Sequence, residues 1–74
     1  MLLGKTKKLI EDKESEIKLN LSNNYKDAAY KEYKELVNII EEFKANGKIG
    51  NKDYDKLSVK LADYKRMFDK ALKR

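Results

Sequence analysis

The chain has 74 residues, a formal net charge of +5 and 42% charged residues, and it contains no proline, cysteine or histidine. A chain this short folds as one domain with a thin core, and the missing residue types exclude disulfides and the usual structural zinc sites. We therefore expect a single domain over residues 1–74, for which self-association is the remaining common source of added stability.

The first predicted element is a helix over residues 2–20, because one set of positions recurs at steps of three and four. The positions on this face are Leu3, Thr6, Ile10, Lys13 and Ile17. Asn24, with Asp27 three residues later, resembles a capping box, which predicts that a second helix starts here. If there is no break, the first two helices fuse into one long rod.

The second predicted helix covers residues 25–46 and has the same spacing. Its apolar face consists of Ala29, Tyr33, Leu36, Ile40 and Phe43. Gly47 is expected to end it in the left-handed conformation common after a helix. Ile49 is an isolated apolar residue in the polar connector, and we expect it to tuck under the turn and close the core.

The third predicted helix covers residues 52–73 and has the most regular spacing. Its apolar positions are Tyr54, Leu57, Leu61, Tyr64, Phe68 and Ala71. A short connection makes consecutive helices antiparallel. The predicted fold is therefore an all-α three-helix bundle, in which the second and third helices form an αα-hairpin and the first packs against it.

Positive charge is concentrated in the last third of the chain, where residues 48–74 include nine basic and four acidic residues. One interpretation is a phosphate-contacting face on the third helix, made of Lys52, Lys56, Lys60, Arg66 and Lys70. The other, which we favour, is that these cations complement the helix dipole and keep the protein soluble. Specific base readout favours arginine, whereas this face is mostly lysine.

Four apolar or aromatic residues are candidates for an interaction surface because they lie beside the apolar faces or lack a clear core role. They are Leu19, Tyr30, Val59 and Met67. Scattered apolar residues are also common on ordinary surfaces. The tyrosines at positions 33, 54 and 64 lie on the apolar faces, so we assign their rings to the core and their hydroxyls to the surface.

The residue inventory predicts that the protein is not an enzyme. Without histidine or cysteine, the commonest general base, metal ligand and thiol nucleophile are missing. No glycine-rich phosphate loop occurs, so we expect no cofactor and no small-molecule substrate. The stretch from Asn46 to Asp53 imitates the second half of a calcium-binding EF-hand loop, but Lys44 would stand at a ligand position. We expect no metal site.

The sequence gives a location by elimination. It shows no secretory signal and no apolar stretch of the ~20 residues that a membrane-spanning helix needs. We therefore expect a cytoplasmic protein without membrane contacts. The abundance of lysine, asparagine, isoleucine and tyrosine suggests an AT-rich genome and a bacterial source.

The segment 35–61 resembles the SHOCT-type short helical hairpin, which has an apolar helix, a Gly-x-Ile turn and an aromatic-bearing helix. Leu36, Ile40, Phe43, Gly47, Ile49 and Tyr54 carry the resemblance. The resemblance implies self-association rather than catalysis. The chain departs from the family pattern at Gly50-Asn51-Lys52, where a Thr-Glu-Glu-type cap is usual, and it continues beyond Leu61.

The expected function is that of a non-enzymatic helical interaction module that forms a homo-oligomer or binds a protein partner. The alternative is a nucleic-acid-binding protein that lays its basic third helix along phosphates. The turn before that helix shows no helix-turn-helix pattern, which favours the first hypothesis.

Overall fold

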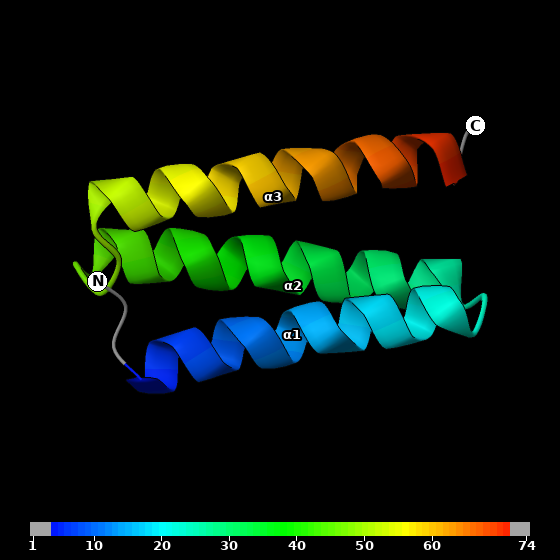
Figure 1. Cartoon of the computed structure of the whole chain (residues 1–74), viewed down its shortest axis with the longest axis horizontal. Helices are drawn as coiled ribbons and strands as arrows, with labels where there is room; N and C mark the ends of the chain where they lie inside the picture. Colours follow the sequence, from blue (N-terminus) through cyan, green and yellow to red (C-terminus); the bar gives the residue numbers. More distant parts are fainter. Residues whose placement is uncertain (1–3, 72–74) are drawn as a thin grey trace.

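The structure, a computed structural model, describes residues 4–71, which form three α-helices. They are α1 (Gly4–Ser22), α2 (Lys26–Ala45) and α3 (Asn51–Ala71), joined by short turns so that neighbours in sequence are antiparallel (Figure 1). The Cα trace measures 35 × 20 × 15 Å, so the long axis is about one helix in length. The predicted all-α fold is confirmed, including the antiparallel α2–α3 hairpin with α1 packed against it.

The predicted boundaries that fall within the described residues differ from the observed ones by one or two residues. The helix predicted to end at residue 20 continues to Ser22, and α1 and α2 are separate helices rather than one rod. The predicted start at residue 2 and the predicted end at residue 73 lie outside the described residues.

The predicted capping box at the start of α2 is wrong. Asn24 adopts a positive φ of 65°, and the residue that precedes α2 is Tyr25, which makes no side-chain capping hydrogen bond. The Tyr25 N–H donates to the carbonyl of Asn20 at 2.7 Å, and the Asn24 N–H donates to the carbonyl of Leu21 at 3.1 Å. Asn24 therefore ends α1 in a Schellman motif, because asparagine tolerates the left-handed conformation that this motif needs.

The second turn uses the same device with glycine. Gly47 has a φ of 74°, and the Lys48 N–H donates to the carbonyl of Phe43 at 2.8 Å. This confirms the left-handed end predicted for α2. Ile49 is only 2% exposed and belongs to the core, so the prediction that it closes this end of the bundle is also confirmed.

The core is shared unequally among the helices. α1 and α2 contact each other much more extensively than α2 and α3 do. Nearly all of the apolar face predicted for α2 is buried, whereas on α3 only Leu57 and Phe68 are. Tyr54, Leu61 and Tyr64 pack against the core but remain half exposed. The apolar spacing of α3 therefore identifies the face that points inward. It does not reveal that this face is only partly buried, which the structure shows.

Aromatic rings hold α3 against α2. The ring of Phe68 lies 5.4 Å from the rings of both Tyr30 and Tyr33, and Tyr33 lies 6.4 Å from Tyr64. Ring pairs at these separations attract each other beyond simple burial. At the other end of the same interface, the Tyr54 hydroxyl donates to Glu41 at 2.6 Å. The α2–α3 contact therefore depends on a few large side chains rather than on a long apolar interface.

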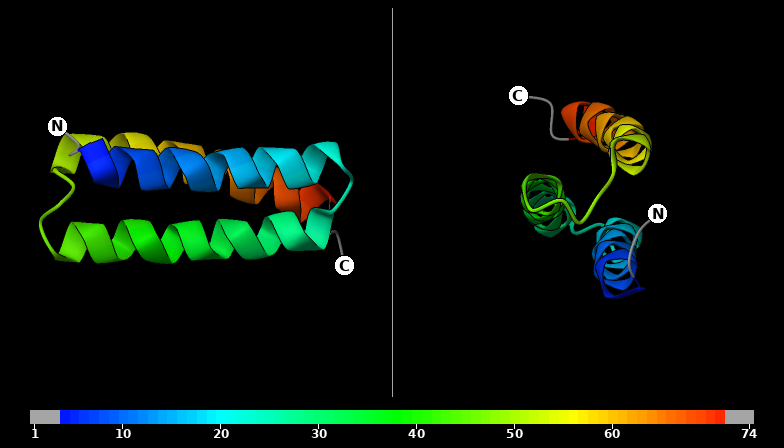
Figure 2. Two further views of the ribbon diagram at one scale, coloured as in Figure 1. Left: turned by 90° about the horizontal axis from the view of Figure 1, so that it is seen from below. Right: turned by 90° about the vertical axis from the view of Figure 1, so that its left-hand side faces the viewer.

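α1 and α3 do not pack against each other through their backbones. No Cα atom of α1 lies within 8 Å of a Cα atom of α3, whereas both helices approach α2 that closely. The view along the helices shows α1 and α3 apart, each beside α2 (Figure 2, right). α1 and α3 therefore contact each other through side chains.

Candidate interaction surface

Polar side chains connect α1 to α3 around Glu14 of α1. One oxygen of its carboxylate accepts a hydrogen bond from the Tyr64 hydroxyl at 3.4 Å and lies 3.6 Å from the Lys60 ammonium. The Glu14 side chain is only 13% exposed, whereas that of Lys60 is 61% exposed. Burial, together with the neighbouring Glu14 carboxylate, raises the pKa of Tyr64, so its hydroxyl stays protonated and serves as a donor.

Two shallow depressions, open to solvent, lie along this side of α3, with volumes of about 340 and 510 Å³. The first lies between α1 and α3 and is lined by Glu14, Lys18, Lys60, Asp63, Tyr64 and Met67. The second continues along α3 and is lined by Asp63, Arg66, Met67, Lys70 and Ala71. Because Asp63 and Met67 line both, the two depressions form one continuous surface, which we call the α1–α3 groove.

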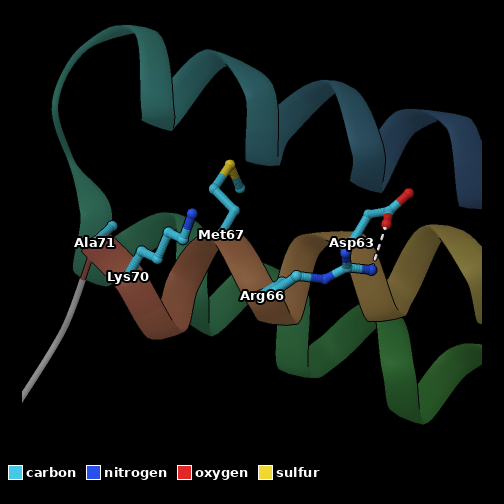
Figure 3. Close-up of a pocket in the computed structure, with 5 residues that line it drawn as sticks. All are labelled: Asp63, Arg66, Met67, Lys70 and Ala71. Carbon is cyan, nitrogen blue, oxygen red and sulfur yellow. Dashed lines mark hydrogen bonds and ion pairs between the residues drawn. The ribbon is translucent and has the colours of Figure 1, made fainter.

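Met67 is at the centre of the α1–α3 groove. Its side chain leaves α3 on the side that faces α1, with Lys70 beside it (Figure 3). Met67 is 36% exposed, so a large part of an apolar side chain contacts solvent here. Methionine is flexible and polarizable, and it adapts well to contact surfaces of different shapes.

The charges around the groove do not cancel. Glu14 pairs with Lys60, and Asp63 pairs with Arg66 at 3.0 Å, the contact dashed in Figure 3. Lys18 on α1 and Lys70 on α3 form no ion pair with any other residue in the range 4–71. Lys18 on α1 and Lys70 on α3 are therefore uncompensated, and each lines one of the two depressions together with Met67.

All five residues of the predicted phosphate-contacting face are exposed. Lys60, Arg66 and Lys70 line the α1–α3 groove, but Lys60 and Arg66 already have acidic partners. Lys52 and Lys56 line neither depression. Lys56 precedes Lys60 by about one turn of α3 and Lys52 by about two turns. The predicted face is therefore continuous along the helix, but only part of it lines the groove.

The four residues predicted for an interaction surface do not lie together. Leu19 and Val59 are 62% and 63% exposed, and each follows a buried residue of its helix, Ile17 or Leu57, by two positions. Two positions correspond to about 200° around an α-helix, so both point away from the core on different helices. Tyr30 belongs to the α2–α3 aromatic contact, with the Lys34 ammonium 5.2 Å from its ring centroid. Only Met67 contributes to the groove.

Sequence reasoning missed an ion cluster that joins α1 to α2. The Lys13 ammonium lies 2.8 Å from both Glu32 and Glu35 of α2 and 3.9 Å from Glu16 of its own helix. Hydrogen bonds to Glu32 and Glu35 raise the pKa of Lys13. A lysine on the otherwise mostly apolar face of the first predicted helix was the available signal, because such a cation needs acidic partners on the helix that covers it.

Two of these carboxylates influence each other. A hydrogen bond between Glu16 and Glu32 lowers the pKa of Glu32, and Lys13 lowers it further, whereas the same bond raises the pKa of Glu16. The two carboxylates therefore titrate as a coupled pair rather than independently. The cluster lies at the α1–α2 interface and away from the groove, and we assign it a role in aligning these two helices.

No helix in the range 4–71 is long and apolar enough to cross a membrane. Among the same residues, no three acidic side chains are grouped so that they could hold a metal ion. A scan against models of protein families, a search of curated proteins and a search of solved structures each gave no significant match. The α1–α3 groove is therefore the candidate site that the geometry itself identifies.

Proposed function

We propose that the protein is a non-enzymatic helical interaction module that binds through the α1–α3 groove. The observation that carries the proposal is the separation of the α1 and α3 backbones, together with Met67, which is partly exposed and lines depressions with Lys18 of α1 and Lys70 of α3. Exposed apolar atoms with a polar rim are typical of protein interaction sites. The SHOCT-type resemblance of residues 35–61 also implies self-association, and we propose the bacterial cytoplasm as the location of the protein.

Binding of nucleic acid by α3 is the second candidate. It is supported by Lys52, Lys56 and Lys60, which are exposed and follow one another at single turns of the helix. It is weakened because Lys60 already contacts Glu14 and because no arginine contributes to this stretch. Lysines without arginine suit general phosphate attraction better than recognition of particular bases.

Site-specific photo-crosslinking tests the proposed function. A photoreactive residue is placed at Met67 in one variant and at Val59 in another, both in the full chain. Both side chains belong to α3 and both are exposed, but only Met67 lines the groove. We expect adducts at position 67 and none at position 59, in purified protein if the chain self-associates and in the source cells if a partner binds.

The mass of the adduct distinguishes these cases, because an adduct of two identical chains has twice the mass of the 8.7 kDa chain. Equal yields of adduct at positions 67 and 59, or none at position 67 in either setting, would contradict the assignment of the binding surface to the groove.

A further inference from the structure

We propose that the α1–α3 groove binds an acidic amphipathic helix from a partner protein, which takes the fourth position of a four-helix bundle. This inference rests on the proposed function and adds to it the shape and charge of the partner. The carrying observation is that uncompensated Lys18 and Lys70 belong to different helices and that each lines a depression together with partly exposed Met67.

The backbone arrangement leaves room for a fourth helix. In closed bundles, neighbouring helix axes lie about 8–10 Å apart. Cα atoms of α1 and of α3 come within 8 Å of Cα atoms of α2 but not of each other (Figure 2, right). α1 and α3 comprise 19 and 21 residues, which corresponds to about 30 Å at 1.5 Å per residue. A partner helix of about 20 residues would therefore match the length of α1 and α3, and it would extend beyond the groove, whose lining on α3 runs from Lys60 to Ala71.

The groove offers an apolar floor to such a helix. Met67 is partly exposed at its centre, Tyr64 is half exposed toward α1, and Ala71 lies half exposed one turn beyond Met67. A helix bound in this position would contact these residues with apolar side chains at steps of three and four. Met67 can adapt to the shape of the side chains that contact it.

The charges of the walls determine the chemistry of the partner. The carboxylates that line the groove, Glu14 and Asp63, are already paired with Lys60 and Arg66. Lys18 and Lys70 remain, one on each wall. Glutamate or aspartate on both flanks of the bound helix would pair with these two lysines, and complementary charges would speed association and select against basic partners.

A second copy of the chain does not fit this site. Each helix already turns its apolar face inward, as Ile17 of α1, Leu36 of α2 and Phe68 of α3 illustrate, so no helix is left to fill a neighbour's groove. Placing two grooves face to face would bring the uncompensated cations of one copy toward those of the other, which is unfavourable. The charge pattern therefore favours a different chain as the partner.

The test uses two designed helical peptides of about 20 residues, a length set by the helix rise. Both carry leucine at steps of three and four, one with glutamate on its flanks and the other with lysine at the same positions. Binding of each to the full-length protein is measured by fluorescence anisotropy at several salt concentrations. We expect the acidic peptide to bind and the basic peptide not to bind.

Paired variants locate the binding. Because burying an unpaired charge at the centre of an interface is costly, Met67→Glu should weaken binding about tenfold or more, whereas Val59→Glu should change it less than about twofold. Both variants replace an exposed apolar residue of α3 by the same charge. Lys18→Gln with Lys70→Gln should reduce both the affinity and its salt dependence. Lys5→Gln with Lys31→Gln removes the same charge at exposed positions that line neither depression and should do neither.

Several outcomes would overturn the inference. These are equal binding of the two peptides, no binding of the acidic peptide, equal effects of Met67→Glu and Val59→Glu, or a dimer that forms at low salt and that Met67→Glu dissociates. Binding of a single-stranded oligonucleotide that Lys52→Gln, Lys56→Gln and Lys60→Gln together abolish, without peptide binding, would support the nucleic-acid candidate instead. If adducts form at position 67 but the acidic peptide does not bind, the result supports the proposed function and contradicts only the proposal of an acidic helix as the partner.

Discussion

Lys13 occupies a position on α1 between Ile10 and Ile17 that an apolar residue could fill. Its side chain is 20% exposed, and its two partners on α2, Glu32 and Glu35, are 22% and 44% exposed. Ions that are this close and partly shielded interact more strongly than surface pairs, yet they gain less than a well-packed apolar contact would. We therefore expect Lys13 to act mainly by aligning α1 on α2, and to contribute less to the free energy of unfolding than a well-packed apolar residue would.

Replacing Lys13 by methionine should lower the free energy of unfolding by about 1–2 kcal/mol, because the Glu32 and Glu35 carboxylates lose their shared cation. Lys8→Met is the matched control on the same helix. Its pair with Asp12 spans 3.6 Å between side chains that are 77% and 56% exposed, so its loss should cost less than about 0.5 kcal/mol. Urea denaturation of the two variants measures the difference, and equal midpoints would show that the cluster contributes nothing specific.

At the residue scale, the sequence was sufficient to identify most of the core. The three-four spacing selected Ile10, Ile17, Leu36 and Ile40, all of which are buried. It could not pair Lys13 with Glu32 and Glu35, because that pairing depends on how far α1 slides along α2. Spacing within one helix contains no information on that relative shift.

At the scale of the elements, α3 is held less firmly than the other two helices. It contacts α2 less extensively than α1 does, and its own apolar face is fully buried only at Leu57 and Phe68. The sequence assigned α3 the most regular apolar face. Regular spacing establishes which side faces inward, but the depth of burial depends on the distance between helices and is set by tertiary packing.

Native-state hydrogen exchange should therefore show α3 opening at a lower free energy than α1 and α2. Segments with few buried apolar contacts open locally before the whole domain unfolds. We expect the central amides of α3 to exchange faster than those around Ile17 and Leu36 in α1 and α2. Phe68→Ala should widen this gap, because it removes the ring that contacts Tyr30 and Tyr33. Equal protection of all three helices would contradict this order.

At the scale of the whole molecule, the groove combines two features that the sequence indicated separately. Met67 belonged to one candidate set, and Lys60, Arg66 and Lys70 belonged to another. The proximity of Met67 and Lys60 to Lys18 and Glu14 of α1 could not be predicted, because it depends on the separation of two helices that do not adjoin in sequence. Leu19 and Val59 remain ordinary exposed residues, because in the described part of the chain they do not line the groove with the other candidate residues.

The response of molar mass to salt follows from this arrangement. The chain carries a formal net charge of +5, and each groove exposes uncompensated Lys18 and Lys70 beside Met67. Two copies that meet through their grooves repel each other at low salt, whereas at about 1 M salt the Debye length falls to about 3 Å and the apolar contact is no longer opposed. Light scattering after size-exclusion chromatography should thus show a monomer at low salt and, if any association occurs, a larger mass only at high salt. Met67→Glu should abolish that association, and Val59→Glu should leave it intact. A dimer that forms at low salt and dissociates at high salt would instead mean that oppositely charged surfaces meet, and the groove would then not be the surface through which copies associate.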